Sequence, residues 1–174
     1  MKIGIIGTGR MAAVFAQTLV QMEEVTCYAA ASRSKEKAEK FAEEYGFQKA
    51  YGSYEELCAD PEVELVYIAT PHSFHYENME LCIRCKKPVL CEKAFTLNSS
   101  QAEKIRELAA KEGVFAAEAI WTRYMPSRNM INELLESGII GNVSALTANL
   151  SYPVSFKERI MKPELAGGAL LDLG

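Results

Sequence analysis

Residues 2–12 read KIGIIGTGRMA, a short apolar run that passes into glycines and then into a helical pattern. Beyond the glycines, apolar side chains recur at helical spacing at Met11, Val14, Phe15, Leu19 and Met22. In a strand–turn–helix of this kind Gly7 makes the tight turn, Gly9 lets a pyrophosphate approach the backbone, and helix N–H groups hold the phosphates. We therefore expect a dinucleotide to be bound by Gly7, Thr8, Gly9, Arg10 and Met11; the alternative is an ordinary glycine-rich turn.

Strand and helix patterns alternate through the next part of the chain. Short apolar strands are predicted at residues 2–6, 25–31, 49–51, 64–69, 88–91 and 114–120. Helices are predicted between them, and two of these begin at capping boxes, Ser53-x-x-Glu56 and Ser100-x-x-Glu103. The alternation predicts an α/β fold, a Rossmann doubly wound parallel sheet with helices on both faces and right-handed crossovers.

The pattern changes after Ile120. A helix is predicted from Pro126 through Leu135, and residues 143–152 alternate like a long strand. We expect residues 1–120 to form a dinucleotide-binding Rossmann domain and residues 121–174 to begin an α/β substrate domain. Because the final apolar element has no polar end, we expect this second domain to be incomplete and the chain to be truncated.

The composition is that of an ordinary globular protein, with 174 residues, of which 49% are hydrophobic and 24% charged. This excludes a disordered chain and a disulfide-built mini-scaffold. The formal net charge is -4 and no basic run exceeds Lys86-Lys87, so neither a nucleic acid nor a membrane surface is an expected partner. The sequence shows no export signal and no membrane-spanning run, so we expect a cytoplasmic protein that acts on small molecules.

The five cysteines are an odd number, which in a chain without an export signal favours free thiols over disulfides. Cys82 and Cys85 form a C-x-x-C pair at the end of a predicted helix, whereas reactive thiols are typical of a helix start. No second pair completes a zinc site. We expect buried helix cysteines and no bound metal.

The segment after the second predicted strand decides between the two nicotinamide cofactors. An NAD-binding protein carries a carboxylate here for the ribose 2′-hydroxyl, but the sequence is Ser32-Arg33-Ser34-Lys35. A guanidinium pairs with a 2′-phosphate and stacks on adenine, and serine hydroxyls donate to phosphate oxygens. Ser32 and Arg33 therefore favour NADP over NAD, and the missing acid counts against a methyltransferase with an adenosine-type ligand. A solvated basic turn is the alternative, and a stronger one for Lys35 than for Arg33.

Two further loops follow strands whose carboxyl ends face the same ligand in such folds. They carry Thr70, Pro71, His72 and His75 after one strand, and Glu92 and Lys93 after the next. Moving hydride at a carbinol carbon requires a proton to leave or join the oxygen, and we expect Lys93 to carry that proton. A surface lysine after an edge strand is the alternative.

His72 and His75 are the only histidines, and no third metal ligand accompanies them. We place both among the cofactor-binding residues and expect His75 to hydrogen-bond in its loop near the ribose or the substrate. Capping of the next helix is an equal alternative for His72. Trp121 and Arg123 follow the last predicted strand. We expect them to contact substrate, as an aromatic wall and a cation; packing at a domain junction is an equal alternative.

These motifs, in their order, resemble those of a known family. They are GIIGTGRMA, SRS, ATPHSFH, CEKAFTLN, EAIWTRYMP and GGALLDLG. Together they are similar to the oxidoreductases grouped around glucose-fructose oxidoreductase and inositol dehydrogenase, and most of all to the dimeric dihydrodiol dehydrogenase branch. The resemblance implies a Rossmann domain followed by an open-faced, mostly antiparallel α/β domain. It also implies tightly bound NADP(H) and oxidation of sugars, cyclic polyols or trans-dihydrodiols.

The resemblance implies roles for three residues. Lys93, which matches the lysine of the family's Glu-Lys-Pro motif, would be the general acid/base, Glu92 would touch the nicotinamide ribose, and Asp172 would be an active-site carboxylate. The chain departs from the family at Ala94, where the family has proline, and at His72, where asparagine is usual. It also ends before the tyrosine or histidine that the family carries a few residues past Asp172.

The function expected from these observations is that of an NADP-dependent oxidoreductase that transfers hydride between nicotinamide and a carbinol carbon of a sugar, cyclic polyol or trans-dihydrodiol. Two alternatives stay open: a non-catalytic NADP-binding regulatory module, and a fragment that only binds nucleotide. We expect these 174 residues alone to lack dehydrogenase activity. The full-length protein is expected to be a homo-oligomer through the rest of its second domain.

Overall fold

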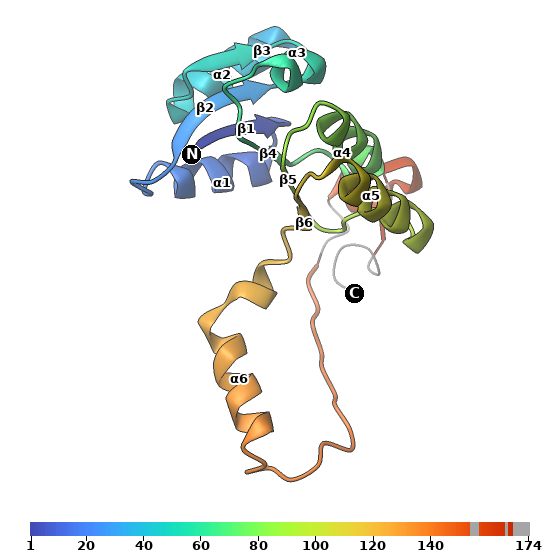
Figure 1. Ribbon diagram of the computed structural model, residues 1–174. Helices are drawn as coiled ribbons and strands as arrows, with labels where there is room; N and C mark the ends of the chain where they lie inside the picture. Colours follow the sequence, from blue (N-terminus) through green and yellow to red (C-terminus); the bar gives the residue numbers. More distant parts are fainter. Residues whose placement is uncertain (154–156, 166, 169–174) are drawn as a thin grey trace.

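The strand order of the central sheet is the doubly wound arrangement that the sequence predicts. The computed structural model describes residues 1–153, 157–165 and 167–168, and its six strands lie in the order β3-β2-β1-β4-β5-β6 (Figure 1). All pairings are parallel among β1 (Lys2–Ile6), β2 (Thr26–Ala31), β3 (Lys49–Tyr51), β4 (Leu65–Ile68), β5 (Val89–Cys91) and β6 (Ala116–Glu118). The winding reverses between β1 and β4, which is where such folds bind their ligands.

Helices cover both faces of this sheet. They are α1 (Arg10–Leu19), α2 (Lys35–Tyr45), α3 (Tyr54–Ala59), α4 (His75–Arg84) and α5 (Ser99–Glu112). Side chains of α1 and α2 form one buried cluster with Ile5 and Tyr67, whereas α3, α4 and α5 pack with Ile6 and Ile68 in a second cluster. Because neighbouring strand residues point to opposite faces, each face of the sheet has its own apolar core.

The start of α5 differs from the prediction. The capping box expected at Ser100 and Glu103 is wrong, because the helix is capped by Asn98, whose Oδ1 accepts from the Gln101 N–H at 3.0 Å. Gln101 Oε1 in turn accepts from the Leu97 N–H at 3.0 Å. Asn98 has the extended backbone that a cap requires, so the reciprocal cap forms two residues earlier than expected.

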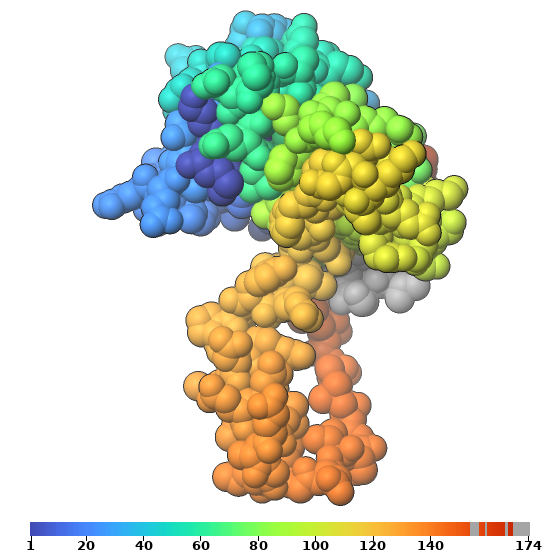
Figure 2. Space-filling model, in the orientation of Figure 1, coloured from blue at the N-terminus to red at the C-terminus, as the bar shows by residue number. Residues whose placement is uncertain are grey.

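The chain beyond β6 projects away from the sheet (Figures 1 and 2). A short 3-10 turn, η2 (Trp121–Tyr124), leads into α6 (Pro126–Glu136), which begins at the proline as predicted. The long strand expected over residues 143–152 is wrong, since these residues form no strand and Leu146 is 89% exposed. A strand needs a neighbour for its N–H and C=O groups, and none of the described strands pairs with this stretch.

Residues 157–165 return toward the sheet. They form α7 (Glu158–Met161) and η3 (Pro163–Leu165), and η3 contacts the 3-10 turn η1 (His72–Phe74). Ile160 is buried, so this segment packs against the body of the molecule. None of the helices in the described residues is both long enough and apolar enough to cross a lipid bilayer.

A buried carboxylate fixes the start of β4. Asp60 follows α3, and its Oδ2 accepts from Lys49 Nζ at 2.8 Å and from Tyr51 Oη at 2.6 Å. Its Oδ1 accepts from the Glu62 N–H at 3.0 Å. Burial acts to raise the pKa of Asp60, but the hydrogen bonds from Lys49, Tyr51 and Glu62 hold it below its ordinary value. The cluster therefore requires Asp60 to be ionised.

We expect Asp60→Asn to lower the free energy of unfolding by about 1–3 kcal/mol at pH 7, because the three donors around this buried side chain lose a charged acceptor. A carboxyl with a depressed folded-state pKa stabilises the fold above its unfolded pKa of about 3.9, and this contribution is lost as the pH falls through the folded-state pKa. The difference between wild type and variant in urea unfolding should therefore shrink below about pH 4. Glu62→Gln, at an exposed carboxylate nearby, is the control; equal losses in both variants would contradict the role of Asp60.

Candidate functional site

The carboxyl ends of the central strands lie at one level. Ile6 of β1 is paired with Ala31 of β2 and with Ile68 of β4, and Ile68 is paired with Cys91 of β5. The loops that follow these strands therefore meet at one edge of the sheet. They carry most of the residues that the sequence singles out, namely Gly7 to Met11, Ser32 and Arg33, Thr70 to His75, and Glu92 and Lys93.

Glycine is needed at positions 7 and 9 for different reasons. Gly7 has a φ of 96°, and a Cβ there would lie 2.9 Å from the carbonyl oxygen of Ala69. Gly9 precedes α1 in an extended conformation, and a Cβ there would meet no protein atom within 4 Å. Gly7 thus serves the close approach of two loops, whereas the space at Gly9 is open to a ligand at the start of a helix.

A cleft of about 520 Å³ opens over these loops. The predicted residues that line it are Gly7, Thr8, Gly9, Ser32, Arg33, Thr70 and Pro71. Lys37, Lys40 and Tyr54 line it as well, although the sequence alone did not single them out. Arg33, Lys37 and Lys40 bring three cations to the cleft, and Glu44 brings one carboxylate. The cleft therefore favours an anionic ligand.

Arg33 borders a second hollow beside this cleft. Its guanidinium lies 5.3 Å from the centre of the Phe74 ring, a cation–π contact. The second hollow, of about 440 Å³, shares with the first cleft the lining residues Arg33, Tyr54, Thr70 and Pro71. The contact with Phe74 holds the guanidinium where the two hollows meet, in position for a planar or anionic group.

His75 is fully buried and ties two loops together. Its ring nitrogens lie 2.7 Å from the Ala94 carbonyl oxygen and 2.9 Å from the Thr70 carbonyl oxygen. Asn78 Nδ2 donates to Thr70 Oγ1 at 3.0 Å on the same side. Burial lowers the pKa of His75, against the raising effect of the two carbonyls. This geometry agrees with the expected hydrogen-bonding role in the loop. The assignment of His75 to the cofactor-binding residues stays a prediction, and its full burial favours support of the loop over direct contact.

A hydrogen bond from the buried Tyr67 holds the side chain of Glu92. Tyr67 Oη donates to Glu92 Oε1 at 2.5 Å, and the buried Tyr67 ring stacks on Phe15 with ring centres 3.8 Å apart. Burial, followed by the contact with Glu92, raises the pKa of Tyr67, so its hydroxyl remains a donor. Lys93 is half-buried directly after Glu92, and its peptide bond to Ala94 is cis. The lysine thus sits between Glu92, held by Tyr67 of β4, and Ala94, held by His75 of α4.

Five predicted cofactor residues lie outside the lining of the cleft: His75 and Glu92, described above, and Arg10, Met11 and His72. Arg10 and Met11 are exposed on the first turn of α1. His72 is half-buried on η1, with its ring 5.5 Å from that of His75 in an edge-on arrangement. Any contribution of Arg10, Met11 and His72 to cofactor binding would therefore come from the helix start and the loop that they form, and not from the cleft wall.

The residues expected on the substrate side are not brought to the cleft. Trp121 is 63% exposed on η2, and Arg123 lines a separate hollow between η2 and α6. Asp172 lies outside the described residues. The described part of the chain thus assembles the cofactor side of the expected site.

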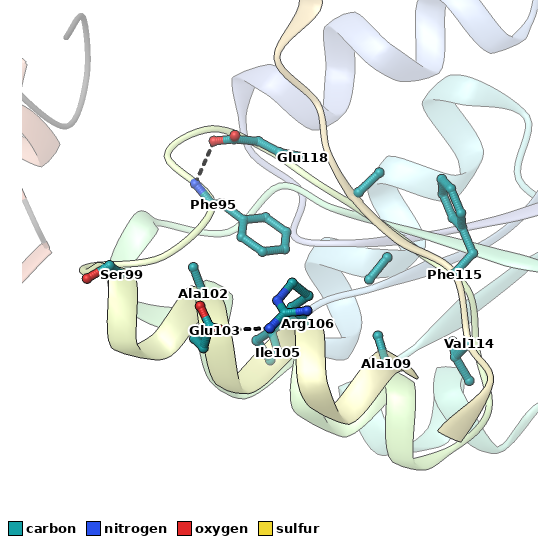
Figure 3. A pocket seen from close by; sticks show the side chains of 12 residues that line it. Phe95, Ser99, Ala102, Glu103, Ile105, Arg106, Ala109, Val114, Phe115 and Glu118 are labelled. Carbon is teal, nitrogen blue, oxygen red and sulfur yellow. Dashed lines mark hydrogen bonds and ion pairs between the residues drawn. The ribbon is translucent and has the colours of Figure 1, made fainter. Parts of the chain in front are cut away.

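A larger hollow lies elsewhere. A groove of about 660 Å³ runs between α5 and the edge strand β6, and Figure 3 shows Phe95, Phe115 and Val114 around it. The Phe95 N–H donates to Glu118 Oε1 at 2.9 Å, as drawn there. The glycine turn, Arg33 and Lys93 are not among its lining residues. The candidate site is therefore the smaller cleft, because the chemistry-bearing loops surround that one.

Known proteins match this chain over its whole length. A model of the family described as "Oxidoreductase family, NAD-binding Rossmann fold" matches residues 1–119. D-xylose 1-dehydrogenase (NADP(+)) of Hypocrea jecorina is 41% identical, and the alignment covers 100% of this chain and 50% of that protein. The trans-1,2-dihydrobenzene-1,2-diol dehydrogenase of Mus musculus is 39% identical, with 100% and 53% covered. The chain thus spans about half the length of these relatives.

Solved structures of oxidoreductases match this chain as well. A 3-ketoreductase from Actinomadura kijaniata, in complex with NADP and TDP-benzene, matches with a TM-score of 0.92 and 27% identity over 99% of this chain and 54% of that one. An NAD binding oxidoreductase from Klebsiella pneumoniae matches with a TM-score of 0.75 and 30% identity over 81% of this chain and 40% of that one. This chain belongs to the oxidoreductase family with an NAD-binding Rossmann fold, the family around glucose-fructose oxidoreductase and inositol dehydrogenase whose motifs it carries.

Proposed function

We propose that this chain forms the NADP-binding part of an enzyme that transfers hydride between nicotinamide and a carbinol carbon of a sugar, cyclic polyol or trans-dihydrodiol. The observation that carries the proposal is the cleft that begins at the glycine turn and gathers Arg33, Lys37 and Lys40. The relatives named as an NADP-dependent xylose dehydrogenase and as a dihydrodiol dehydrogenase support the same reaction class. Residues 1–120 would be the cofactor domain and residues 121–174 the first part of the substrate domain.

The residues of the cleft fit NADP. At Gly9 the backbone is open to a pyrophosphate, and the free N–H groups at the start of α1 favour an anion there. Arg33, with Lys37 and Lys40 on α2, would hold the 2′-phosphate. The loop after β2 begins Ser32-Arg33 and offers no carboxylate that would repel this phosphate. These features favour NADP over NAD.

The loop after β5 would carry the proton chemistry. When bound, the nicotinamide supplies or accepts the hydride. Glu92, whose Oε1 is held by Tyr67, would present its other oxygen to the nicotinamide ribose. Lys93 would hold or deliver the proton at the carbinol oxygen, and its neighbours Glu92 and Ala94 are fixed by Tyr67 and His75. Such fixed neighbours limit the positions that a catalytic side chain samples.

The substrate side and the assembly are proposed from the family resemblance. Asp172 would contribute an active-site carboxylate, and Trp121 and Arg123 would contact substrate once the rest of the substrate domain is in place. We propose that the working protein is a cytoplasmic homo-oligomer whose partners are sugars, polyols or dihydrodiols, with no nucleic acid and no membrane. Light scattering of the full-length protein tests the oligomer.

The decisive test of the function combines binding with turnover. The chain itself is titrated calorimetrically with NADP⁺ and NAD⁺, and NADP⁺ should bind more tightly. A full-length form is then assayed for NADP⁺ reduction with D-xylose, D-glucose, myo-inositol and a trans-dihydrodiol. Reduction with at least one of these supports the proposal. Binding of NADP⁺ without turnover on any of them would favour a regulatory module instead.

We expect Arg33→Ala to weaken NADP⁺ binding by about 1.5–3 kcal/mol, the usual loss for a charge-assisted hydrogen bond. NAD⁺, which lacks the 2′-phosphate, should bind with nearly unchanged affinity. Lys35→Ala is the matched control, because the Lys35 ammonium donates to the Ala50 carbonyl at 2.5 Å and does not line the cleft. Calorimetric titration of both cofactors measures the effect, and equal losses for NADP⁺ and NAD⁺ would show that Arg33 does not read the phosphate.

A further inference from the structure

Both ring nitrogens of His75 face backbone carbonyls of loops beside the cleft. Nδ1 lies 2.7 Å from the Ala94 oxygen, and Nε2 lies 2.9 Å from the Thr70 oxygen. A neutral imidazole carries one N–H, whereas an imidazolium carries two. In the neutral ring one contact is therefore a hydrogen bond, and in the other a nitrogen lone pair faces an oxygen.

The surroundings of the ring keep it neutral near pH 7. His75 has no exposed surface, and burial lowers its pKa from the ordinary value of 6.5. The two carbonyls and the carboxylates of Glu92 and Glu118 act to raise this pKa, but burial has the larger effect. The ring of His72 lies 5.5 Å away, edge-on. His75 therefore has a single N–H, which one of its two nitrogens carries.

The two distances assign that N–H to Nδ1. A lone pair that faces an oxygen is repelled by it, so this pair is expected at the longer distance, which is the one to Thr70. The Thr70 loop also has another contact with α4, because Asn78 Nδ2 donates to Thr70 Oγ1 at 3.0 Å. The N–H of His75 is therefore directed at Ala94.

We propose that His75 is a positioning residue whose Nδ1–H donates to the Ala94 carbonyl and so fixes the backbone from which the Lys93 side chain starts. Lysine carries its ammonium on a flexible four-carbon stem. A shift of the backbone at the base of this stem would move the ammonium away from the carbinol oxygen, and small misplacements of a catalytic group are costly. His75 would thus act on the reaction through Lys93 without touching substrate.

The backbone on either side of Lys93 and Ala94 is held by strands. The Glu92 N–H donates to the Ile68 carbonyl of β4 at 2.9 Å, and the Phe95 N–H donates to a β6 carboxylate at 2.9 Å. His75, the first residue of α4, supports the two residues between these anchors. The inference rests on the proposed acid/base role of Lys93, whereas the hydrogen bond from His75 to Ala94 does not.

The first test determines the tautomer in the chain itself. His72 and His75 are the only histidines, so a His72→Gln variant assigns the imidazole signals in NMR spectra of the nitrogen-labelled protein. At about pH 8, above the ordinary pKa of histidine, we expect a neutral His75 ring with its proton on Nδ1. A proton on Nε2, or a charged ring at this pH, would overturn the proposal.

Two amide substitutions separate the two contacts of the ring. The amide nitrogen of asparagine takes the place of Nδ1 and that of glutamine takes the place of Nε2. His75→Asn therefore keeps a donor toward Ala94, and His75→Gln keeps one toward Thr70. Because each variant loses one contact, the two are matched. We expect His75→Gln, and not His75→Asn, to speed amide hydrogen exchange at residues 92–96; equal exchange in both would contradict the proposal.

Kinetics of the full-length form connect this hydrogen bond with Lys93. His75→Gln should lower kcat about 10- to 100-fold and leave substrate KM and NADP⁺ affinity within about threefold of wild type, because misplacing the acid/base group slows chemistry and not binding. His75→Asn should recover kcat to within about threefold. Equal kcat in the two variants would overturn the positioning role. A wild-type enzyme without turnover would instead reject the dehydrogenase function and the catalytic part of this inference with it, whereas the spectra and the exchange pattern decide the hydrogen bond to Ala94 by themselves.

Discussion

Lys93→Met is expected to lower turnover by about 10²- to 10⁴-fold in the full-length enzyme while leaving NADP⁺ affinity nearly intact. Methionine has a similar length but cannot hold or release a proton, so the carbinol oxygen would lose its acid/base partner. The cofactor should still bind, because the cleft is lined by the glycine turn and by Arg33, and not by Lys93. Steady-state kinetics and a calorimetric titration of NADP⁺ on the same preparation measure the two effects.

The control for this variant is Lys104→Met on α5, where an exposed lysine is replaced by the same residue far from the cleft. It should keep wild-type turnover. A Lys93→Met enzyme that retained most of its turnover would refute the acid/base role. A parallel loss of NADP⁺ affinity and turnover would instead indicate that Lys93 holds the cofactor.

The sequence predicts the sheet because its signals are local. Short apolar runs place all six strands, and the order β3-β2-β1-β4-β5-β6 is consistent with right-handed crossovers. The capping box at Ser53 is confirmed, since its Oγ accepts from the Glu56 N–H at 3.2 Å. The strand prediction for residues 143–152 is wrong because alternation indicates only that a strand is possible. A strand forms when a partner is present, which a local pattern does not report.

The site is predicted in part for a similar reason. Residues next to the strand ends, such as Arg33 and Thr70, are found from the sequence because the topology fixes where strand ends lie. Lys37 and Lys40 were missed because they belong to the surface of α2, and only the packing of that helix turns them toward the cleft. His75 shows the opposite case: its place in the motif indicates the site, and only the structure shows that its side chain is buried and holds the loop.

The two glycines of the turn offer a matched pair of substitutions that separates folding from binding. Gly7→Ala places a Cβ at a φ of 96° and 2.9 Å from a backbone oxygen that cannot move without shifting the loop after β4. The left-handed backbone costs a non-glycine residue about 1–2 kcal/mol, and the close contact adds about 1–3 kcal/mol. We therefore expect Gly7→Ala to lower the free energy of unfolding by about 2–5 kcal/mol.

Gly9→Ala is expected to have the reverse signature, with a free energy of unfolding within about 1 kcal/mol of wild type and NADP⁺ affinity reduced about 10- to 100-fold. The new Cβ meets no protein atom within 4 Å, so the fold has no reason to change. It would occupy the space through which a pyrophosphate approaches the start of α1, so the cofactor would be displaced or the turn strained. Urea unfolding and calorimetric titration of both variants decide the matter. Unchanged NADP⁺ affinity in Gly9→Ala would mean that the phosphates do not lie on this turn and that the cleft binds its ligand in another way.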